Sequence, residues 1–255
     1  MPSGRLNVVV TRRLPEPVET RMRELFDVTL REDDAPMTRE DLARAVREAD
    51  VLVPTLTDRI DAGLIAQAGD QLKLIANYGA GVDHIDVDTA RQHGILVSNT
   101  PGVLTDDTAD MTMALILAVT RRLPEGLALI QSGDWPGWSP TALLGGRVAG
   151  RRLGILGMGR IGQAIAKRCH DGFGMKVVYY NRSPKPIEIE AQQLETLGDV
   201  AAQADFVVAA VPGGAETRHL VDAEFMTAMK PTAHLVNISR GDVVDETALI
   251  SALQE

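Results

Sequence analysis

The sequence predicts an α/β protein built from two doubly wound domains, each with a parallel sheet. Short apolar runs alternate with segments of helical character through the first hundred residues, Thr100-Pro101-Gly102 interrupts the alternation, and it resumes after Gly154. Strand and helix in alternation imply a parallel sheet covered by helices on both faces. A length of 255 residues suits about two domains.

The first domain is expected over residues 1–101. Its apolar runs predict strands at residues 6–10, 27–30, 51–56, 74–78 and 95–98. Helices are expected between them at residues 15–25, 39–47 and 62–67, with Thr38 as the N-cap of the second helix.

The second domain is expected over residues 102–255. It opens with a long helix over residues 105–122, whose apolar face carries Ala109, Met113, Ile116 and Leu117. Pro124 is expected to end this helix, and a second helix reaches Gln131, followed by a loop over residues 133–140. Strands are then predicted at residues 153–156, 177–180, 206–211 and 234–238, and a last helix at residues 246–254.

Composition and charge exclude several classes of partner. Apolar residues make up 45% of the chain and charged residues 24%, as in ordinary globular proteins. The formal net charge of -9 argues against nucleic acid and anionic membranes as partners. The most apolar helical stretch, residues 111–119, is far too short to cross a bilayer.

Cys169 is the only cysteine, so no intramolecular disulfide can form. This usage fits a reducing compartment, and we expect a cytoplasmic protein. The thiol follows a glycine-rich segment on a predicted helix. We expect it to be a small buried side chain rather than a nucleophile.

The most informative segment runs from Leu153 to Gly162. Its apolar strand leads directly into the pattern Gly157-x-Gly159-x-x-Gly162, and a helix follows. In this arrangement Gly157 permits a tight turn, Gly159 lets the backbone approach a diphosphate, and Gly162 lets the helix pack close to the strand. The start of the helix adds unpaired N–H groups and a partial positive charge. A dinucleotide site is predicted at Gly157, Met158, Gly159, Arg160, Ile161 and Gly162.

The segment at the end of the next strand predicts which dinucleotide binds. Sites for NAD usually carry Asp or Glu there, about twenty residues after the glycines. This chain has Asn181-Arg182-Ser183 instead, with Lys185 close by in sequence. The guanidinium of Arg182 and the hydroxyl of Ser183 suit a 2′-phosphate. We expect NADP in preference to NAD, while a solvated loop arginine is the competing interpretation of Arg182.

Five segments together resemble the D-isomer-specific 2-hydroxyacid dehydrogenases, in particular their glyoxylate/hydroxypyruvate reductase branch. In chain order they are residues 77–86, residues 98–102, residues 154–162, Val211-Pro212 with Glu216-Thr217-Arg218, and residues 237–241. The resemblance implies a flavodoxin-like substrate domain over residues 1–101 and a Rossmann cofactor domain over residues 102–255.

The resemblance also implies roles for individual residues. Ala80 and Gly81 would present backbone N–H groups to the substrate carboxylate, in a turn where small residues allow close approach. Arg240 would bind the carboxylate and the keto oxygen, and it is the one catalytic residue expected within this chain. The adenosine and nicotinamide would be bordered by Val211, Pro212, Thr217, Ile238 and Ser239, and Thr108 is a further candidate contact to the phosphates.

A homodimer is implied as well. In this branch the region matching residues 102–150 forms a dimerisation arm. Trp135 and Trp138 lie in its loop, where a tryptophan would either cap the neighbouring subunit's site or pack at the interface.

The family's proton donor is a His oriented by a Glu, and both are expected beyond the segment that matches residues 237–241, farther along than this chain extends. The histidines present are expected to be structural, with no acidic partner suggested by spacing: His84, His93, His170, His219 and His234. Their spacing predicts no metal site.

The chain is therefore expected to be the front portion of a longer polypeptide. The last helix has no Gly or Asn past its end, and the final Glu255 opposes the helix dipole. The second domain shows about four strands where a Rossmann sheet has about six. We expect the 255-residue stretch alone to bind nucleotide weakly or misfold, with little reductase activity.

The favoured function is reduction of a small 2-keto acid, such as glyoxylate or hydroxypyruvate, to the 2-hydroxy acid with NADPH. Two alternatives stay open. One is a dinucleotide-sensing binding protein without catalysis, like the corepressors related to this fold. The other is a formate or phosphite dehydrogenase of the same superfamily, of which the formate enzyme is disfavoured by the short segment before Leu6.

Overall fold

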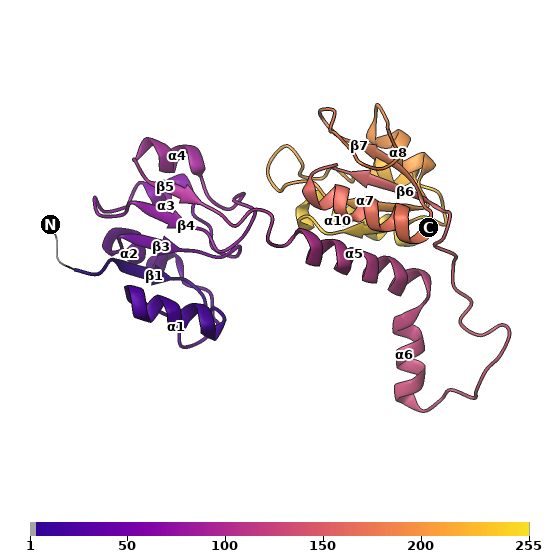
Figure 1. Ribbon diagram of the computed structural model, residues 1–255, viewed down its shortest axis with the longest axis horizontal. Coiled ribbons are helices and arrows are strands. Elements are labelled where there is room, and N and C mark those ends of the chain that lie inside the picture. The colour runs from indigo at the N-terminus through magenta and orange to yellow at the C-terminus, as the bar shows by residue number, and fades with distance from the viewer. Residues whose placement is uncertain (1–3, 255) are drawn as a thin grey trace. The chain divides into compact units, whose positions relative to one another are not determined.

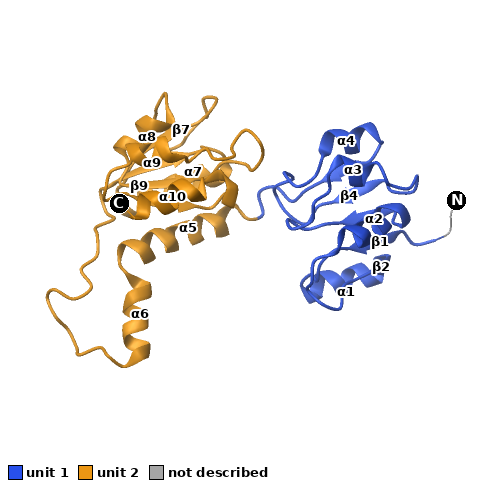
Figure 2. Ribbon diagram, turned by 180° about the vertical axis from the view of Figure 1, so that it is seen from behind, with its two compact units in different colours: residues 1–103 blue, residues 104–255 orange. Residues whose placement is uncertain are grey.

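The computed structural model describes residues 4–254 and divides into two compact units, residues 1–103 (unit 1) and residues 104–255 (unit 2) (Figure 2). The division falls two residues after the expected end of the first domain. Within the described residues, each unit contains one five-stranded sheet whose paired strands are all parallel. The predicted α/β class with two parallel sheets is confirmed.

Unit 1 has the strand order β2-β1-β3-β4-β5, which is the flavodoxin-like order. Its strands are β1 (Asn7–Val10), β2 (Asp27–Thr29), β3 (Val51–Val53), β4 (Leu74–Ala76) and β5 (Leu96–Ser98). Its helices are α1 (Glu16–Leu25), α2 (Arg39–Glu48), α3 (Ala62–Ile65) and α4 (Val87–Gln92).

Local chemistry explains where these elements begin and end. Thr38 caps α2 as predicted, because its side chain accepts a hydrogen bond from the amide of Asp41. Asp86 caps α4 in the same way through the amide of Thr89, and this short helix was not predicted. Strand β3 stops at Val53 rather than at residue 56, since Pro54 follows and has no N–H group to donate.

Unit 2 has the strand order β10-β9-β6-β7-β8. Counted from β6 this is 5-4-1-2-3, the order of a Rossmann sheet read from the other edge. Its strands are β6 (Arg152–Leu156), β7 (Lys176–Tyr180), β8 (Ala191–Gln193), β9 (Phe206–Ala209) and β10 (His234–Asn237). Its helices are α5 (Thr105–Thr120), α6 (Leu123–Ser132), α7 (Arg160–Phe173), α8 (Leu197–Gln203), α9 (Ala223–Ala228) and α10 (Glu246–Gln254), with a 3-10 turn η1 (Gly241–Val243).

The expectation of about four strands in the second domain is wrong, because β8 adds a fifth within the described residues. Its sequence, Ala-Gln-Gln, carries no apolar alternation, so it was not recognisable as a strand. It forms by pairing with β7, whose Tyr179 donates its hydroxyl to the side chain of Gln193 at 3.2 Å.

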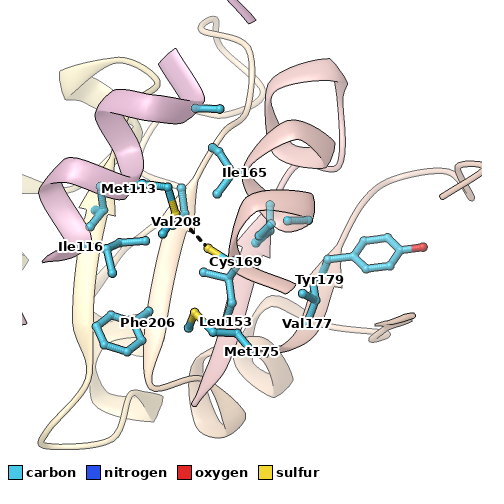
Figure 3. Close-up of a cluster of buried hydrophobic side chains, with 14 of the residues drawn as sticks. Met113, Ile116, Leu153, Ile165, Cys169, Met175, Val177, Tyr179, Phe206 and Val208 are labelled. Carbon is cyan, nitrogen blue, oxygen red and sulfur yellow. Dashed lines mark hydrogen bonds between the residues drawn. The ribbon is translucent and has the colours of Figure 1, made fainter. Parts of the chain in front are cut away.

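Buried side chains cover both faces of the sheet in unit 2. Figure 3 shows one face, where Met113 and Ile116 of α5 and Ile165 of α7 lie over Leu153, Phe206 and Val208. The opposite face is covered by α8 and α9 through Val200 and Phe225. Burial on both faces explains why the central strands are continuous apolar runs.

Cys169 lies in the core between α5 and α7, where its thiol donates to the sulfur of Met113 at 3.2 Å (Figure 3). Burial raises the pKa of the thiol to about 12, so the reactive thiolate does not form near neutral pH. The expected role as a small buried side chain is confirmed.

Helix α6 projects away from the sheet, and the chain returns along a long loop to β6 (Figure 1). Pro124 does not end the long helix. Helix α5 ends at Thr120, Arg122 adopts a left-handed conformation with φ 54°, and Pro124 stands in the first turn of α6, where its missing N–H costs nothing. No residue of α6 is buried. In residues 4–254, no helix has the length and apolar character needed to span a bilayer.

Candidate active site

The carboxyl ends of β6, β7, β9 and β10 lie at one edge of the sheet in unit 2, because the strands are parallel neighbours. Strand β6 is the switch point: β7 follows on one side of it and β9 on the other. Open α/β sheets bind ligands in the crevice at such a point.

The turn after β6 has the geometry predicted for its glycines. Gly157 has φ 98°, and a Cβ there would stand 2.6 Å from the carbonyl oxygen of Ala210. A Cβ on Gly162 would overlap the carbonyl oxygen of Gly157, so only glycine lets α7 pack this close to the turn. A Cβ on Gly159 would have no atom within 4 Å. The space beside Gly159 is therefore open, as a bound diphosphate requires.

The start of α7 carries unused donors. In the described part of the chain, the amides of residues 159–162 have no hydrogen-bond partner, as expected for the first turn of a helix. Four such amides and the helix dipole form an anion site. The residues present therefore fit the diphosphate of a dinucleotide.

Met158 does not fit the role predicted for it. Its side chain is fully buried in the core. Its amide donates to the Asn181 side-chain oxygen at 3.0 Å, and its carbonyl accepts from the side chain of Gln163 at 3.3 Å. Because these groups are already used, we remove Met158 from the direct contacts to the cofactor.

The segment after β7 forms a braced turn beside the glycines. The Asn181 amide group donates to the carbonyl of Ser183 at 2.7 Å. The guanidinium of Arg182 forms an ion pair with the carboxylate of Glu216, and both side chains are exposed, at 71% and 77%. The ion pair joins the loop after β7 to the loop after β9. Arg182 is thus a largely exposed loop arginine that is paired with an acid from the neighbouring loop.

The loops after β9 and β10 are joined to each other. The amide of Val211 donates to the hydroxyl of Ser239 at 2.9 Å. The hydroxyl of Thr217 donates to the carbonyl of Pro212 at 2.7 Å and closes its own loop. Ile238 is held at the sheet by its amide, which donates to Ala209. Thr108 lies half-buried in the first turn of α5.

Arg240 is half-buried and does not point freely into bulk water. It follows β10 in a turn that Asn237 braces from both sides. The Asn237 amide group donates to the Arg240 carbonyl at 2.7 Å, and its oxygen accepts from the Ser239 amide at 3.0 Å. One guanidinium N–H donates to the Ser239 carbonyl at 3.2 Å.

In unit 1, the turn of residues 79–81 has its carbonyl groups tied back. Buried Asn77 donates to the carbonyls of Gly79 at 3.0 Å and Gly81 at 2.8 Å, and Asn99 donates to the carbonyl of Ala80 at 2.7 Å. The amides of Ala80 and Gly81 have no partner in the described residues. The three carbonyl groups are thus bonded to side chains, while the amides of Ala80 and Gly81 remain available as donors. Such available amides suit an anion, for example a carboxylate.

Each of the five histidines has a side-chain, backbone or ring partner. His84 bonds the oxygen of Asn77 at 3.0 Å and so orients the amide that braces the turn. His93 contacts the carbonyl of Thr89 at 2.9 Å, and His234 stacks on Phe206. Two histidines have an acidic neighbour that the sequence spacing did not suggest. His170 contacts Asp171 at 2.8 Å, and His219 lies 3.7 Å from Asp245.

The sequence indicated no role for four residues that hold these turns and loops together: Asn77, Asn99, Asn237 and Glu216. The three asparagines brace turns through backbone carbonyls. Their signal in sequence was weak, namely an Asn at or just after a predicted strand end. In residues 4–254, no three His, Cys, Asp or Glu side chains gather in a way that could hold a metal ion.

A Rossmann sheet with a glycine turn suited to an anion at its switch point, in one chain with a flavodoxin-like unit, defines the class of two-domain dinucleotide-binding α/β proteins. Residues 113–255 match the model of the D-isomer specific 2-hydroxyacid dehydrogenase NAD binding domain. The chain belongs to the D-isomer-specific 2-hydroxyacid dehydrogenase family. The resemblance inferred from the five segments is confirmed, and the cofactor is a nicotinamide dinucleotide.

Individual relatives place the chain in the glyoxylate reductase branch. It is 45% identical over 255 residues to the glyoxylate reductase of Thermococcus onnurineus, an alignment that covers 97% of this chain and 75% of that protein. The glyoxylate reductase of Pyrococcus horikoshii is 44% identical, with coverage of 97% and 75%. Among solved structures, the NADPH-dependent glyoxylate/hydroxypyruvate reductase of Sinorhizobium meliloti, in complex with NADP and malonate, has a TM-score of 0.86 at 32% identity, with coverage of 98% and 76%.

Proposed function

We propose that the protein reduces a small 2-keto acid of the glyoxylate or hydroxypyruvate class to the 2-hydroxy acid, with NADPH as the preferred cofactor and NADH as a second one. The observation that carries this proposal is the turn of residues 157–162, with open space at Gly159 and four unpartnered amides. The names of the relatives support the substrate class.

In this proposal the cofactor lies along the carboxyl edge of the sheet in unit 2. The amides of Gly159, Arg160, Ile161 and Gly162 hold the diphosphate. Arg182 and Ser183 hold the 2′-phosphate, with Asn181 fixing their turn. The remaining contacts are Val211, Pro212, Thr217, Ile238 and Ser239, which border the adenosine and nicotinamide, and Thr108 near the phosphates.

Arg240 binds the substrate carboxylate and keto oxygen through its planar, permanently charged guanidinium. The bound nicotinamide supplies the hydride. Arg240 stabilises the negative charge that develops on the keto oxygen, and Asn237 holds the turn that presents it. The turn at Ala80 and Gly81 offers amides to a carboxylate. We assign no proton donor among the five histidines.

We further propose a cytoplasmic homodimer whose arm includes α6. Three large apolar side chains of this helix, Leu123, Leu127 and Ile130, are exposed at spacings of four and three residues, so they form one stripe. Trp135 and Trp138 are also exposed, the latter at 85%. An apolar stripe with aromatic neighbours is typical of a subunit interface.

The test is an absorbance assay at the nicotinamide band with the protein at its natural length. NADPH and NADH are compared across glyoxylate, hydroxypyruvate and pyruvate. We expect turnover of glyoxylate or hydroxypyruvate with a preference for NADPH. Arg240→Lys should lose about 100-fold or more in kcat/KM while NADPH affinity stays unchanged, because Lys cannot bond two oxygens in one plane. A tenfold preference for NADH, or no reduction of any of the acids, would contradict the proposal.

A further inference from the structure

The ion pair of Arg182 with Glu216 stands at the rim where the adenosine ribose would lie. The two residues are 34 positions apart in sequence. Arg182 comes from the loop after β7 and Glu216 from the loop after β9, so they approach from opposite sides of β6.

Both loops are held in place by their own hydrogen bonds. On one side Asn181 joins the amide of Met158 to the carbonyl of Ser183. On the other side Thr217, next to Glu216, donates to the carbonyls of Pro212 at 2.7 Å and Gly214 at 3.2 Å. The carboxylate is therefore presented to the guanidinium by a braced loop.

The two charges act oppositely on a 2′-phosphate. A phosphate that binds Arg182 must displace or share the carboxylate of Glu216 and is repelled by it. A ribose 2′-hydroxyl carries no charge and can donate a hydrogen bond to a carboxylate, as it does in NAD sites to the acidic side chain after the second strand. One carboxylate thus disfavours NADPH and favours NADH.

We infer that Glu216 is a specificity-determining residue. Its carboxylate weakens the NADPH preference created by Arg182 and accepts a hydrogen bond from the 2′-hydroxyl of NADH. The inference rests on the proposed cofactor site. It assigns the chain a rim of mixed charge that accepts both dinucleotides. The exposure of both side chains limits the size of the effect, since water and salt screen exposed charges.

The test measures binding by calorimetry, without turnover. The probes are 2′,5′-ADP and ADP, which differ by the 2′-phosphate, on the protein at its natural length. Glu216→Gln keeps the shape and removes the charge. It should tighten 2′,5′-ADP about fivefold at low salt and leave ADP unchanged or up to about threefold weaker. The difference should shrink as salt is raised, which a merely structural change would not produce.

Glu24→Gln is the matched control. It breaks a similarly exposed pair, Arg21 with Glu24 at 2.6 Å in unit 1, and should change neither affinity. The inference is overturned if Glu216→Gln does not raise the ratio of 2′,5′-ADP affinity to ADP affinity above that of the wild-type protein. The proposed function would remain in that case. A wild-type protein that binds neither nucleotide overturns both.

Discussion

The side-chain oxygen of Asn181 accepts a 3.0 Å hydrogen bond from the backbone amide of Met158. This bond ties the turn that carries Arg182 to the glycine turn that precedes α7. It also occupies the backbone amide of Met158, which directly precedes the four unpartnered amides of residues 159–162. The position that commonly carries an acid in NAD sites is here a neutral brace.

Replacing this brace with an acid should reverse the cofactor preference. In Asn181→Asp a carboxylate oxygen can still accept from Met158, but its charge repels a 2′-phosphate. We expect the Kd of NADPH to rise about tenfold, with a change below about threefold for NADH, measured by calorimetry. Asn181→Ala serves as the comparison, since it loses the brace and should weaken both cofactors. Equal losses of NADPH and NADH affinity in Asn181→Asp would show that charge is not the determinant.

Asn99 should matter for the substrate and little for stability. Asn99 is exposed, and its side-chain amide group donates to the carbonyl of Ala80. This bond helps to keep the backbone amides of Ala80 and Gly81 available as donors. In Asn99→Ala we expect KM for the keto acid to rise about fivefold, equivalent to one hydrogen bond, with unchanged NADPH affinity. Asn99→Asp should raise KM further, since a carboxylate cannot donate and repels the substrate anion. Steady-state kinetics decide, and an unchanged KM in both variants would remove the Ala80–Gly81 turn from the substrate site.

The thiol of Cys169 should be silent in the folded protein. Burial raises its pKa from the ordinary 9.0 to about 12, so the folded state holds the proton that the unfolded chain releases above pH 9. The corresponding stability is complete below pH 9 and is lost as the pH rises toward 12. We expect a thiol reagent at pH 8 to label the native protein negligibly and the denatured protein once. Rapid native labelling would contradict the buried position between α5 and α7.

The apolar stripe of α6 should be an interface. Leu127→Asp places a charge in its middle and should convert a dimer into a monomer, as measured by size-exclusion chromatography with light scattering. Leu96→Asp is the control, because this leucine is exposed on strand β5 at the edge of unit 1. A monomeric wild-type protein, or a dimer that survives Leu127→Asp, would contradict the arm proposed for α6.

The fold was predictable where apolar runs are buried on both faces, as in β6 and β9, because such strands differ plainly from their surroundings. Strand β8 was missed because its polar sequence shows no apolar alternation, and only its pairing with β7 defines it as a strand. Helices α4, α8 and α9 were missed; each has six or seven residues, which give little periodicity, although the still shorter α3 was predicted.

The candidate site was predictable where a role depends on residue type at fixed spacing. Gly157 and Gly162 are such residues, since the turn excludes any side chain at either position. The pairing of Arg182 with Glu216 could not be predicted, because only the sheet order brings the two loops together. The bonds of Asn77 and Asn237 depend on turn conformations that short-range patterns do not specify.

Gly159→Ala tests whether the turn of residues 157–162 binds the cofactor diphosphate. Its new methyl group meets no protein atom within 4 Å, so the expected loss of stability is small and comes from Ala being a poorer N-cap of α7 than Gly. Gly162→Ala is the comparison; overlap with Gly157 should lower its stability by about 1–3 kcal/mol. The decisive measurement is the Kd of NADPH for Gly159→Ala by calorimetry, with the melting temperature recorded in parallel. We predict at least about tenfold weaker binding with at most a small drop in melting temperature, because the methyl group occupies the space of the phosphates. Wild-type affinity in this variant would contradict the account.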